Sequence, residues 1–335
     1  MKKWHYPFLL FLIIGTVFII NKNEKTTNTP FQSNEGMVFG TVYHIKYQSP
    51  VDLHNEITAT LKQVDNSLSM FNPQSCISQI NNGTTNKPDS LFIEVFNLSR
   101  SVSQLTDGCF DPTVAPLVNA WGFGKDKDAT ADSATIDSIM EFVGWKKIEF
   151  ADGIIVKKDE RITLDFSAIA KGYGADLVAR MFETKGLKNY MIEIGGEIVC
   201  KGINPKGSAW KIGINKPIED SIQTQAIQSI LSLNDCAMAT SGNYRNFYVK
   251  DGKKIAHTIN PKNGHPIQRS IVSSTILAPT CAMADAIATA VMVMGLEKAK
   301  EILINTPDIE AYLIYVDEDG SHKVWHTEKI GNHIE

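Results

Sequence analysis

The sequence predicts an α+β protein with mixed, largely antiparallel sheets and packed helices, preceded by an apolar N-terminal export or anchor segment. Strand-like segments follow one another without intervening helices, which favours antiparallel pairing over a doubly wound parallel sheet. Residues 281–294 combine helical spacing with nearly all small or apolar side chains, as a buried helix does. The 335 residues are 43% hydrophobic and 21% charged, which excludes a disordered, collagen-like or multi-span membrane chain.

Residues 1–21 predict a signal anchor or a signal peptide. Lys2 and Lys3 precede an uncharged apolar run over 7–20, and a basic start before a short apolar core is typical of export signals. The run is short for a membrane span, but no small-x-small cleavage site follows it, so we favour an uncleaved anchor. The two lysines place the rest of the chain outside the cytoplasm, tethered to the inner membrane and facing the periplasm.

The first half of the remaining chain predicts helices between strands. After a polar linker over 22–35, the alternation in 37–47 predicts the first strand of a domain spanning 36–335. Helical spacing of apolar residues predicts helices over 51–68, 92–105 and 134–143, and short apolar runs predict strands over 148–150, 154–157 and 161–165. Residues 108–124 mix turn formers with aromatics, so we expect either a loop packed by its own rings or an aromatic ligand wall.

The second half predicts more strands than helices. Helical spacing covers 168–185, and the strands that follow are expected over 190–194, 198–201, 210–214 and 227–233. Asp251-Gly252 predicts a hairpin turn within 247–257, and Asp319-Gly320 predicts one between strands at 311–316 and 322–325.

Charge and cysteine content narrow the function classes. Lysine plus arginine number 33 and aspartate plus glutamate 37, a net charge of −4, which gives no general attraction to nucleic acid. The five cysteines are scattered and never form a C-x-x-C pair, so neither a zinc site nor a disulfide framework is expected. They are Cys76, Cys109, Cys200, Cys236 and Cys281.

A strand that ends at Asp165 is followed by a helix that starts near Ser167. The free N–H groups of a helix start suit phosphate, and Lys171 lies one turn further on. The alternative is that Asp165 or Ser167 only caps the helix. A serine acylase is excluded, because its S-x-x-K motif places lysine three residues after serine and here the spacing is four.

Two later segments carry further candidate residues. Ser241, Arg245 and His257 lie near strand ends, where an anion-handling site is one interpretation and a structural histidine the other. Asp285 is the only charged residue between Cys281 and Glu297, and Thr289 lies four residues on, so both share a helix face. A carboxylate with a hydroxyl suits Mg²⁺ or Ca²⁺; the alternative is a hydrogen bond from the backbone or from an arginine.

Taken together, these segments resemble the ApbE family of FAD:protein FMN transferases. The matching segments are 37–41, 69–75, 110–124, 164–172, 194–196, 239–245, 257–261 and 284–289. The resemblance implies an ApbE-like fold and an extracytoplasmic enzyme. It would transfer the FMN moiety of FAD onto a threonine hydroxyl of an acceptor protein and release AMP, with Mg²⁺ required and Ca²⁺ as the alternative.

The resemblance also implies site residues. Flavin contacts fall at Met37, Phe71, Cys109, Phe110, Asp111, Asp165, Lys171 and Ile259. The metal falls at the backbone oxygen of Ala168 and the side chains of Asp285 and Thr289. Some relatives carry a second aspartate where this chain has Ala288, so water or a ligand phosphate would complete the metal shell here.

The mechanism is a hypothesis built on these residues. A divalent cation and Lys171 would offset charge that develops on the pyrophosphate. His257 is the candidate base or orienter for the threonine hydroxyl, and Asp165 is its competitor. Two other functions stay open: a Mg²⁺-dependent FAD pyrophosphatase that gives FMN and AMP, and a flavin-binding protein without catalysis. By family analogy the acceptor is a subunit of a membrane NADH:quinone or ferredoxin:NAD oxidoreductase.

Overall fold

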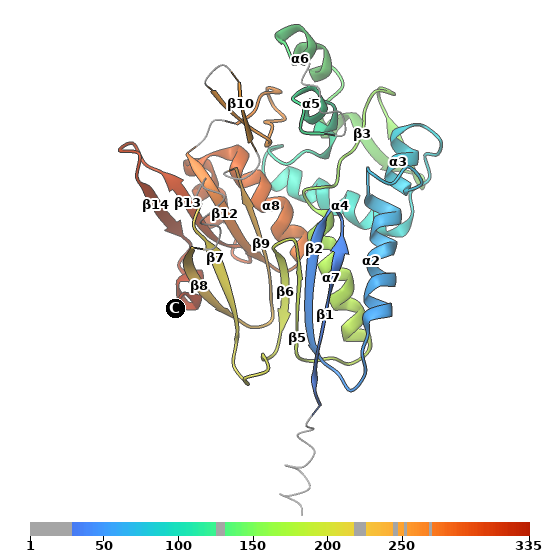
Figure 1. Cartoon of the computed structure of the whole chain (residues 1–335). Coiled ribbons are helices and arrows are strands. Elements are labelled where there is room, and N and C mark those ends of the chain that lie inside the picture. The colour runs from blue at the N-terminus through green and yellow to red at the C-terminus, as the bar shows by residue number, and fades with distance from the viewer. Residues whose placement is uncertain (1–28, 125–130, 218–225, 244–246, 251–252, 268–269) are drawn as a thin grey trace, which may run out of the picture.

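An antiparallel sheet of eight strands organises the part of the chain that the structure describes (Figure 1). The structure, a computed structural model, describes residues 29–124, 131–217, 226–243, 247–250, 253–267 and 270–335. The sheet order is β1 (Phe31–Val38), β2 (Thr41–Gln48), β5 (Tyr190–Ile194), β6 (Glu197–Lys201), β9 (Cys236–Gly242), β12 (Ile271–Ala278), β13 (Glu310–Val316) and β14 (His322–His326). All neighbours pair antiparallel, so the predicted α+β class is confirmed.

Helices and small hairpins cover this sheet. The helices are α2 (His54–Leu68), α3 (Cys76–Asn81), α4 (Ser90–Leu105), α5 (Ala115–Ala120), α6 (Ser133–Met140), α7 (Ala170–Thr184), α8 (Cys281–Met294) and α9 (Leu296–Ile304). Short 3-10 helices are η1 (Pro112–Val114), η2 (Trp145–Lys147) and η3 (Lys329–His333). The hairpins are β3 (Ile148–Ala151) with β4 (Ile154–Lys157), β7 (Trp210–Asn215) with β8 (Ile227–Leu233), and β10 (Phe247–Lys250) with β11 (Lys253–Ala256).

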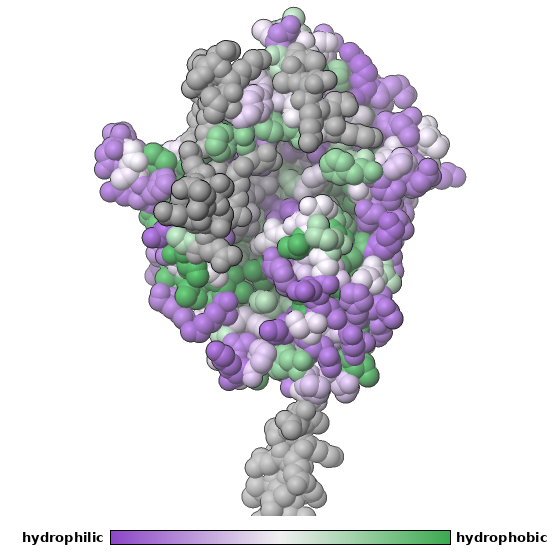
Figure 2. Space-filling view, in the orientation of Figure 1, coloured by the Kyte–Doolittle hydropathy of each residue, from purple (hydrophilic) through white to green (hydrophobic). Residues whose placement is uncertain are grey.

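The hydrophobic core lies on both faces of the sheet. Helices α7 and α8 pack on one face, where apolar side chains of β2 and β5 meet Phe182 and Val178 of α7. The β7–β8 hairpin covers the other face, and its Trp210 and Leu231 pack with Met238 of β9. Figure 2 shows the face of Figure 1 hollowed below α5 and α6.

The first predicted strand is in fact a hairpin. Phe39 and Gly40 form its turn with φ angles of 51° and 73°, the left-handed conformations that a tight two-residue turn requires. Strand β1 begins at Phe31, so the linker predicted over 22–35 extends too far toward the C-terminus. Half of that linker, residues 22–28, and the whole predicted anchor lie outside the described residues. Among the described helices, none is long and apolar enough to cross a membrane.

Three other expectations were wrong for identifiable reasons. The central strands β9 and β12 were missed, because β12 is buried on both faces and shows no alternation, and β9 is built mostly from small residues. Residues 161–165 form no strand, since the side-chain amide of Asn81 pairs with the N–H and carbonyl of Leu164 in place of a neighbouring strand. The expected loop over 108–124 contains η1 and α5.

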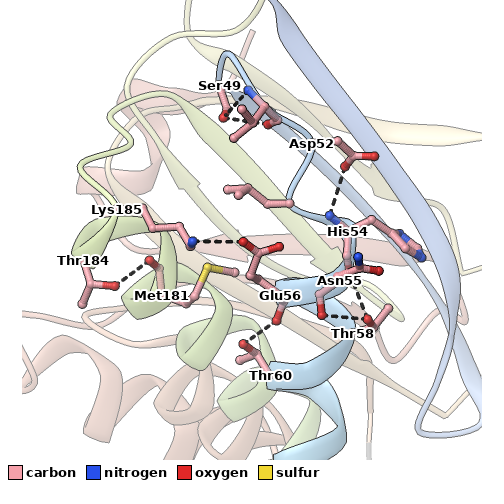
Figure 3. Close-up of polar contacts among 12 residues, drawn as sticks. Ser49, Asp52, His54, Asn55, Glu56, Thr58, Thr60, Met181, Thr184 and Lys185 are labelled. Carbon is pink, nitrogen blue, oxygen red and sulfur yellow. Dashed lines mark hydrogen bonds and ion pairs between the residues drawn. The ribbon is translucent and has the colours of Figure 1, made fainter.

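Polar contacts fix the start of α2 against the end of α7 (Figure 3). Asp52 accepts a hydrogen bond from the backbone N–H of His54 at 3.0 Å, which satisfies one of the unpaired donors of the first turn. The ammonium of Lys185, just after α7, pairs with Glu56 at 3.1 Å. Both side chains are well exposed, so this pair orients the helices and adds little stability.

Candidate active site at the start of helix α7

Helix α7 holds the first turns of α8 in place. The two oxygens of Asp176 accept the backbone N–H groups of Cys281 and Ala282 at 2.8 and 2.9 Å. One turn earlier on the same face, the N–H of Gly172 donates to Oδ2 of Asp285 at 3.1 Å. Glycine is required there because a Cβ would overlap the backbone of Cys281. This close approach directs Asp285 toward the start of α7.

Lys171, Glu197 and Asp285 form a buried charged cluster at this junction. The Lys171 ammonium lies 3.1 Å from Oε1 of Glu197 and 3.6 Å from Oδ2 of Asp285. The two carboxylate side chains are only 5% and 3% exposed, whereas Lys171 is 26% exposed and reaches toward solvent. The fold thus brings one ammonium and two carboxyl groups together from three segments that are far apart in sequence.

The cluster holds two carboxyl groups but only one ammonium. Burial disfavours the charge of Lys171, but the facing carboxylates of Asp285 and Glu197 raise its pKa above the usual value. Burial and the nearby Asp285 carboxylate raise the pKa of Glu197 to about 8, although Lys171 acts in the opposite direction. Oε2 of Glu197 is buried without a hydrogen-bond partner. Two carboxyl groups against one ammonium cannot both ionise easily in a desolvated place, so Glu197 gives up its proton fully only above about pH 8 or when a further cation joins the cluster.

Asp285 makes the neutralising contacts that one of the two alternatives from its sequence context predicted, with a lysine in place of an arginine. Its Oδ2 takes a backbone N–H from Gly172 and faces the ammonium of Lys171, as the neutralising alternative requires. Among the described contacts, no hydrogen bond or ion pair uses Oδ1. One turn on, the hydroxyl of Thr289 hydrogen-bonds the hydroxyl of Ser241 at 3.0 Å.

The donors of the predicted metal site fit a hard cation. Within the described residues, no three His, Cys, Asp or Glu side chains gather in a metal-binding group. A cation held by one carboxylate, one hydroxyl and one backbone carbonyl needs no such group. Asp285, Thr289 and Ala168 would supply oxygen ligands only, which Mg²⁺ and Ca²⁺ prefer. A cation bound beside Asp285 would also help Glu197 to ionise, because the negative charge of Asp285 is one cause of the raised pKa of Glu197.

Asp165 ends the segment that leads into α7. Its Oδ1 accepts the backbone N–H of Ser167 at 2.7 Å, and its own N–H donates to the carbonyl of Pro112 at 2.7 Å. Burial raises the pKa of Asp165, while Ser167 and then Lys171 act in the opposite direction. Neither Asp165 nor Ser167 caps α7: the helix begins after Ile169 with no side-chain cap, and the Asp165–Ser167 bond closes a local turn, so the capping alternative is wrong. The bond to Pro112 places the 108–124 segment beside the start of α7.

Within 108–124 the predicted flavin contacts are mostly buried. Cys109 and Phe110 are 6% and 4% exposed, so their side chains face the core and not solvent. Asp111 uses one oxygen for the N–H and hydroxyl of Thr113 and the other for the N–H of Trp145. Burial raises the pKa of Asp111, against these hydrogen bonds. The structure thus gives Asp111 a role in holding the segment together.

Two other predicted flavin contacts are strongly exposed. Met37 near the β1–β2 turn is 72% exposed, and Phe71 after α2 is 69% exposed. Large apolar side chains that stay in water are informative when they accompany a polar site, because a planar ligand would cover them. Both therefore remain candidates for contact with the isoalloxazine ring.

The histidine segment lies against the aromatic segment. His257 directly follows β11 and is half-buried, and the ring of Phe123 meets it edge-on with centroids 6.3 Å apart. Phe123 also packs on Tyr248 of β10, with centroids 5.2 Å apart. Ile259 is buried and pairs with Pro266 in an isolated bridge. Arg245, the other residue singled out here, lies outside the described residues.

Sequence reasoning missed Glu197 and Asp176. Glu197 follows Gly195-Gly196, whose φ angles of 61° and 100° make the tight β5–β6 turn. A single acidic residue that opens a buried apolar strand was a usable signal. Asp176 lies in a helix that was predicted from the apolar residues around it, so this residue drew no attention. Nothing in the local sequence indicates that its carboxylate binds the first N–H groups of another helix.

The close approach of α7 and α8 predicts a large effect of Gly172→Ala. Helix propensity alone favours alanine by about 1 kcal/mol. The added methyl group would lie 2.8 Å from the backbone nitrogen of Ala282 and overlap the Cys281 carbonyl, so we expect a loss of about 1–3 kcal/mol. Urea unfolding measures this free energy. Gly213→Ala, whose Cβ would meet only Ile227 at ordinary distance, is the control; an equal loss in both variants would contradict the packing argument.

Asp176 predicts a pH-dependent contribution to stability. Burial raises its pKa from 3.8 to about 6, although the N–H groups of Ala282 and Cys281 act against this. Because the folded state binds the proton more tightly, this contribution is complete below about pH 3.8 and is lost as pH rises through about 6. The unfolding free energy of the wild type minus that of Asp176→Asn should fall by roughly 2–3 kcal/mol between pH 4 and 7. A difference that rises with pH would show the opposite shift; Asp137→Asn, on exposed α6, is the control.

Comparison with known proteins gives one family model, several curated relatives and solved structures that match most of the chain. A family model described as the ApbE family matches residues 39–313. An FAD:protein FMN transferase of Haemophilus influenzae is 36% identical over 326 residues, covering 92% of this chain and 93% of the relative. One from Vibrio cholerae is 35% identical over 296 residues, covering 85% and 87%. The solved flavin transferase ApbE from Vibrio cholerae matches with a TM-score of 0.81 and 32% identity, covering 91% of this chain and 99% of that chain.

Proposed function

Because the chain belongs to the ApbE family and is a flavin transferase that uses FAD, we propose that it moves FMN onto a threonine hydroxyl of an acceptor protein with the aid of Mg²⁺. AMP would be the leaving group. The observation that carries the proposal is the buried cluster of Lys171, Glu197 and Asp285 at the start of α7. The Lys171 ammonium of this cluster can bind a pyrophosphate, and the oxygen of Asp285 beside it can bind a hard cation.

Lys171 has the chemistry and the position to bind the pyrophosphate of FAD. Its raised pKa keeps it charged, and it is the most exposed member of its cluster, so the ammonium is accessible from the solvent side. Asp285, Thr289 and the carbonyl of Ala168 would hold Mg²⁺. The bound cation would supply charge stabilisation as the bond between the two phosphates breaks.

The proton of the acceptor threonine needs a recipient. A threonine hydroxyl is a weak nucleophile unless a base takes its proton in the transition state. His257 is our candidate, because an imidazole titrates near neutral pH and this one lies half-buried beside the aromatic segment. Asp165 is the competitor, but its Oδ1 is already committed to the N–H of Ser167.

Glu197 has a supporting part in this proposal. It holds Lys171 from the side opposite to solvent and keeps a second buried oxygen without a partner. When a cation occupies Asp285, Lys171 loses part of its attraction to that carboxylate, and Glu197 remains as its counter-charge. Glu197 thus positions the ammonium for phosphate while Asp285 is engaged.

Glu197→Gln tests this positioning role. The change keeps the shape of the side chain but removes the carboxylate that Glu197 can form when a cation joins the cluster, so Lys171 should pair more closely with Asp285 and compete with that cation. We expect Mg²⁺ affinity to fall about tenfold, measured by calorimetry without FAD. Glu149→Gln, at an exposed position of strand β3, is the matched control. Unchanged Mg²⁺ affinity in Glu197→Gln would remove the role.

The cellular setting completes the proposal. The apolar run over 7–20 would tether the enzyme to the inner membrane, with the domain in the periplasm. The acceptor would be a membrane oxidoreductase subunit that carries the modified threonine, such as one of an NADH:quinone or ferredoxin:NAD oxidoreductase. Protease treatment of spheroplasts tests the topology: the domain should be digested while the inner membrane is intact, and protection would contradict a periplasmic location.

A further inference from the structure

Two of the five cysteines meet on the central sheet. Cys200 of β6 and Cys236 of β9 are directly opposite each other in the antiparallel register, and their sulfur atoms are 3.7 Å apart. Neither forms a disulfide in this structure. They are 36 positions apart in sequence, so the fold and not the local sequence creates the pair.

The backbone around this pair already satisfies the requirements of a disulfide. Residues directly opposite on antiparallel strands have Cα atoms about 4.5–5.5 Å apart, inside the range of about 4.4–6.8 Å that disulfides span. The sulfurs, 3.7 Å apart as thiols, need to approach to about 2.05 Å for the bond to form.

The two thiols differ in solvent exposure and in pKa. Cys200 is buried, whereas Cys236 is partly exposed and is reachable from solvent. The pKa of Cys200 is lowered because the Cys236 thiol hydrogen-bonds to its sulfur, and the pKa of Cys236 is raised by the same bond and by burial. Cys236, the thiol that solvent reaches, therefore attacks an external disulfide slowly because of its raised pKa, and the neighbouring Cys200 is placed to resolve the mixed disulfide.

We propose that Cys200 and Cys236 form an intramolecular disulfide when the protein meets a disulfide oxidant. One thiol, as thiolate, attacks a sulfur of the external disulfide and displaces one thiolate, giving a mixed disulfide. The other thiol, as thiolate, then attacks the protein sulfur of that bond. The Cys200–Cys236 bond forms and the second thiolate of the external disulfide leaves. The two protons lost by the protein thiols pass to the two displaced thiolates, so the external disulfide takes up two electrons and becomes two thiols.

The bond would join the two halves of the sheet near the candidate active site. Strand β6 begins with Glu197, three residues before Cys200, and β9 carries Ser241, which hydrogen-bonds Thr289. The disulfide would close a loop that contains the β7–β8 hairpin and restrict the unfolded chain. We expect oxidation to raise the melting temperature by about 5 °C.

The test uses the full chain, purified in reduced form and then incubated with oxidised glutathione. After the glutathione is removed, the protein is denatured and alkylated without a reductant. We expect three alkylated cysteines and one linked peptide pair, containing Cys200 and Cys236. Cys200→Ala should abolish both the link and the rise in melting temperature, whereas Cys76→Ala, which removes a cysteine outside the pair, should keep both.

Three results would overturn the proposal. Five alkylated cysteines after oxidation would show that the pair does not close. A linked peptide that joins other cysteines, or two copies of the chain, would show that the register does not determine the partner. Stable mixed disulfides with glutathione at Cys200 or Cys236 would show that the second exchange step fails.

Discussion

Replacing Asp285 by alanine is expected to reduce divalent-cation-dependent release of AMP from FAD by about 10³-fold or more. The carboxylate is the only charged side chain among the three groups that would hold the cation, and losing several kcal/mol of charge stabilisation corresponds to a rate loss of this size. The substitution also leaves Lys171 paired with Glu197 alone, so the ammonium should move away from the start of α8. AMP release, followed by chromatography at saturating FAD over a range of Mg²⁺ concentrations, measures the effect.

Two further variants separate chemistry from folding. Asp285→Asn keeps the size of the side chain and an oxygen for the N–H of Gly172, so it should fold while binding Mg²⁺ weakly in calorimetry. Asp137→Ala, on exposed α6, should behave as the wild type. Full AMP release from folded Asp285→Asn at low Mg²⁺ would exclude Asp285 as a metal ligand.

Replacing His257 by alanine is expected to slow transfer to the acceptor threonine by about 10²–10⁴-fold, the usual contribution of a positioned base. FAD affinity should change little, because the phosphate-binding groups belong to α7 and α8 and not to the segment after β11. Single-turnover rates with a threonine-containing acceptor peptide, together with FAD binding by fluorescence, separate the two effects.

The competitor and a control sharpen this second result. If Asp165 is the base, Asp165→Asn loses the rate and His257→Ala keeps it. His265→Ala removes a second imidazole, which packs on Trp121 and not on Phe123, and it should leave transfer intact. Equal losses in the His257 and His265 variants would indicate a general packing effect and remove the base assignment.

Elements were predictable from the sequence where apolar residues repeat along one face, as in helix α2 and strand β5, which were located closely. Helix α8 was predicted at its observed bounds, 281–294, because nearly all of its residues are small or apolar. Strand β12 was not predictable because it lies in the middle of the sheet and is covered on both faces, and β9 was not because it is built mostly from small residues. Strands covered on both faces lose the alternation that distinguishes them from other buried segments.

The candidate site was predictable as separate pieces and not as an arrangement. Lys171 and Asp285 were singled out for different reasons, a phosphate-binding helix start and a lone acid in an apolar helix. Their approach to 3.6 Å depends on Gly172 allowing α7 and α8 to touch, which only the packed structure reveals. Glu197 was missed because its importance comes from its contact with Lys171 of α7, which only the packing of that helix on the sheet creates.

The most direct test of the account is the fate of FAD in the presence of Mg²⁺ and a threonine-containing acceptor peptide. Mass spectrometry of the peptide and chromatography of the nucleotides distinguish the three functions that the sequence left open. The account predicts a peptide heavier by one FMN group and one AMP released for each peptide modified, with both lost when Mg²⁺ is chelated. Free FMN with AMP and an unmodified peptide would instead identify a pyrophosphatase, and intact FAD would identify a flavin-binding protein; either result would contradict the account.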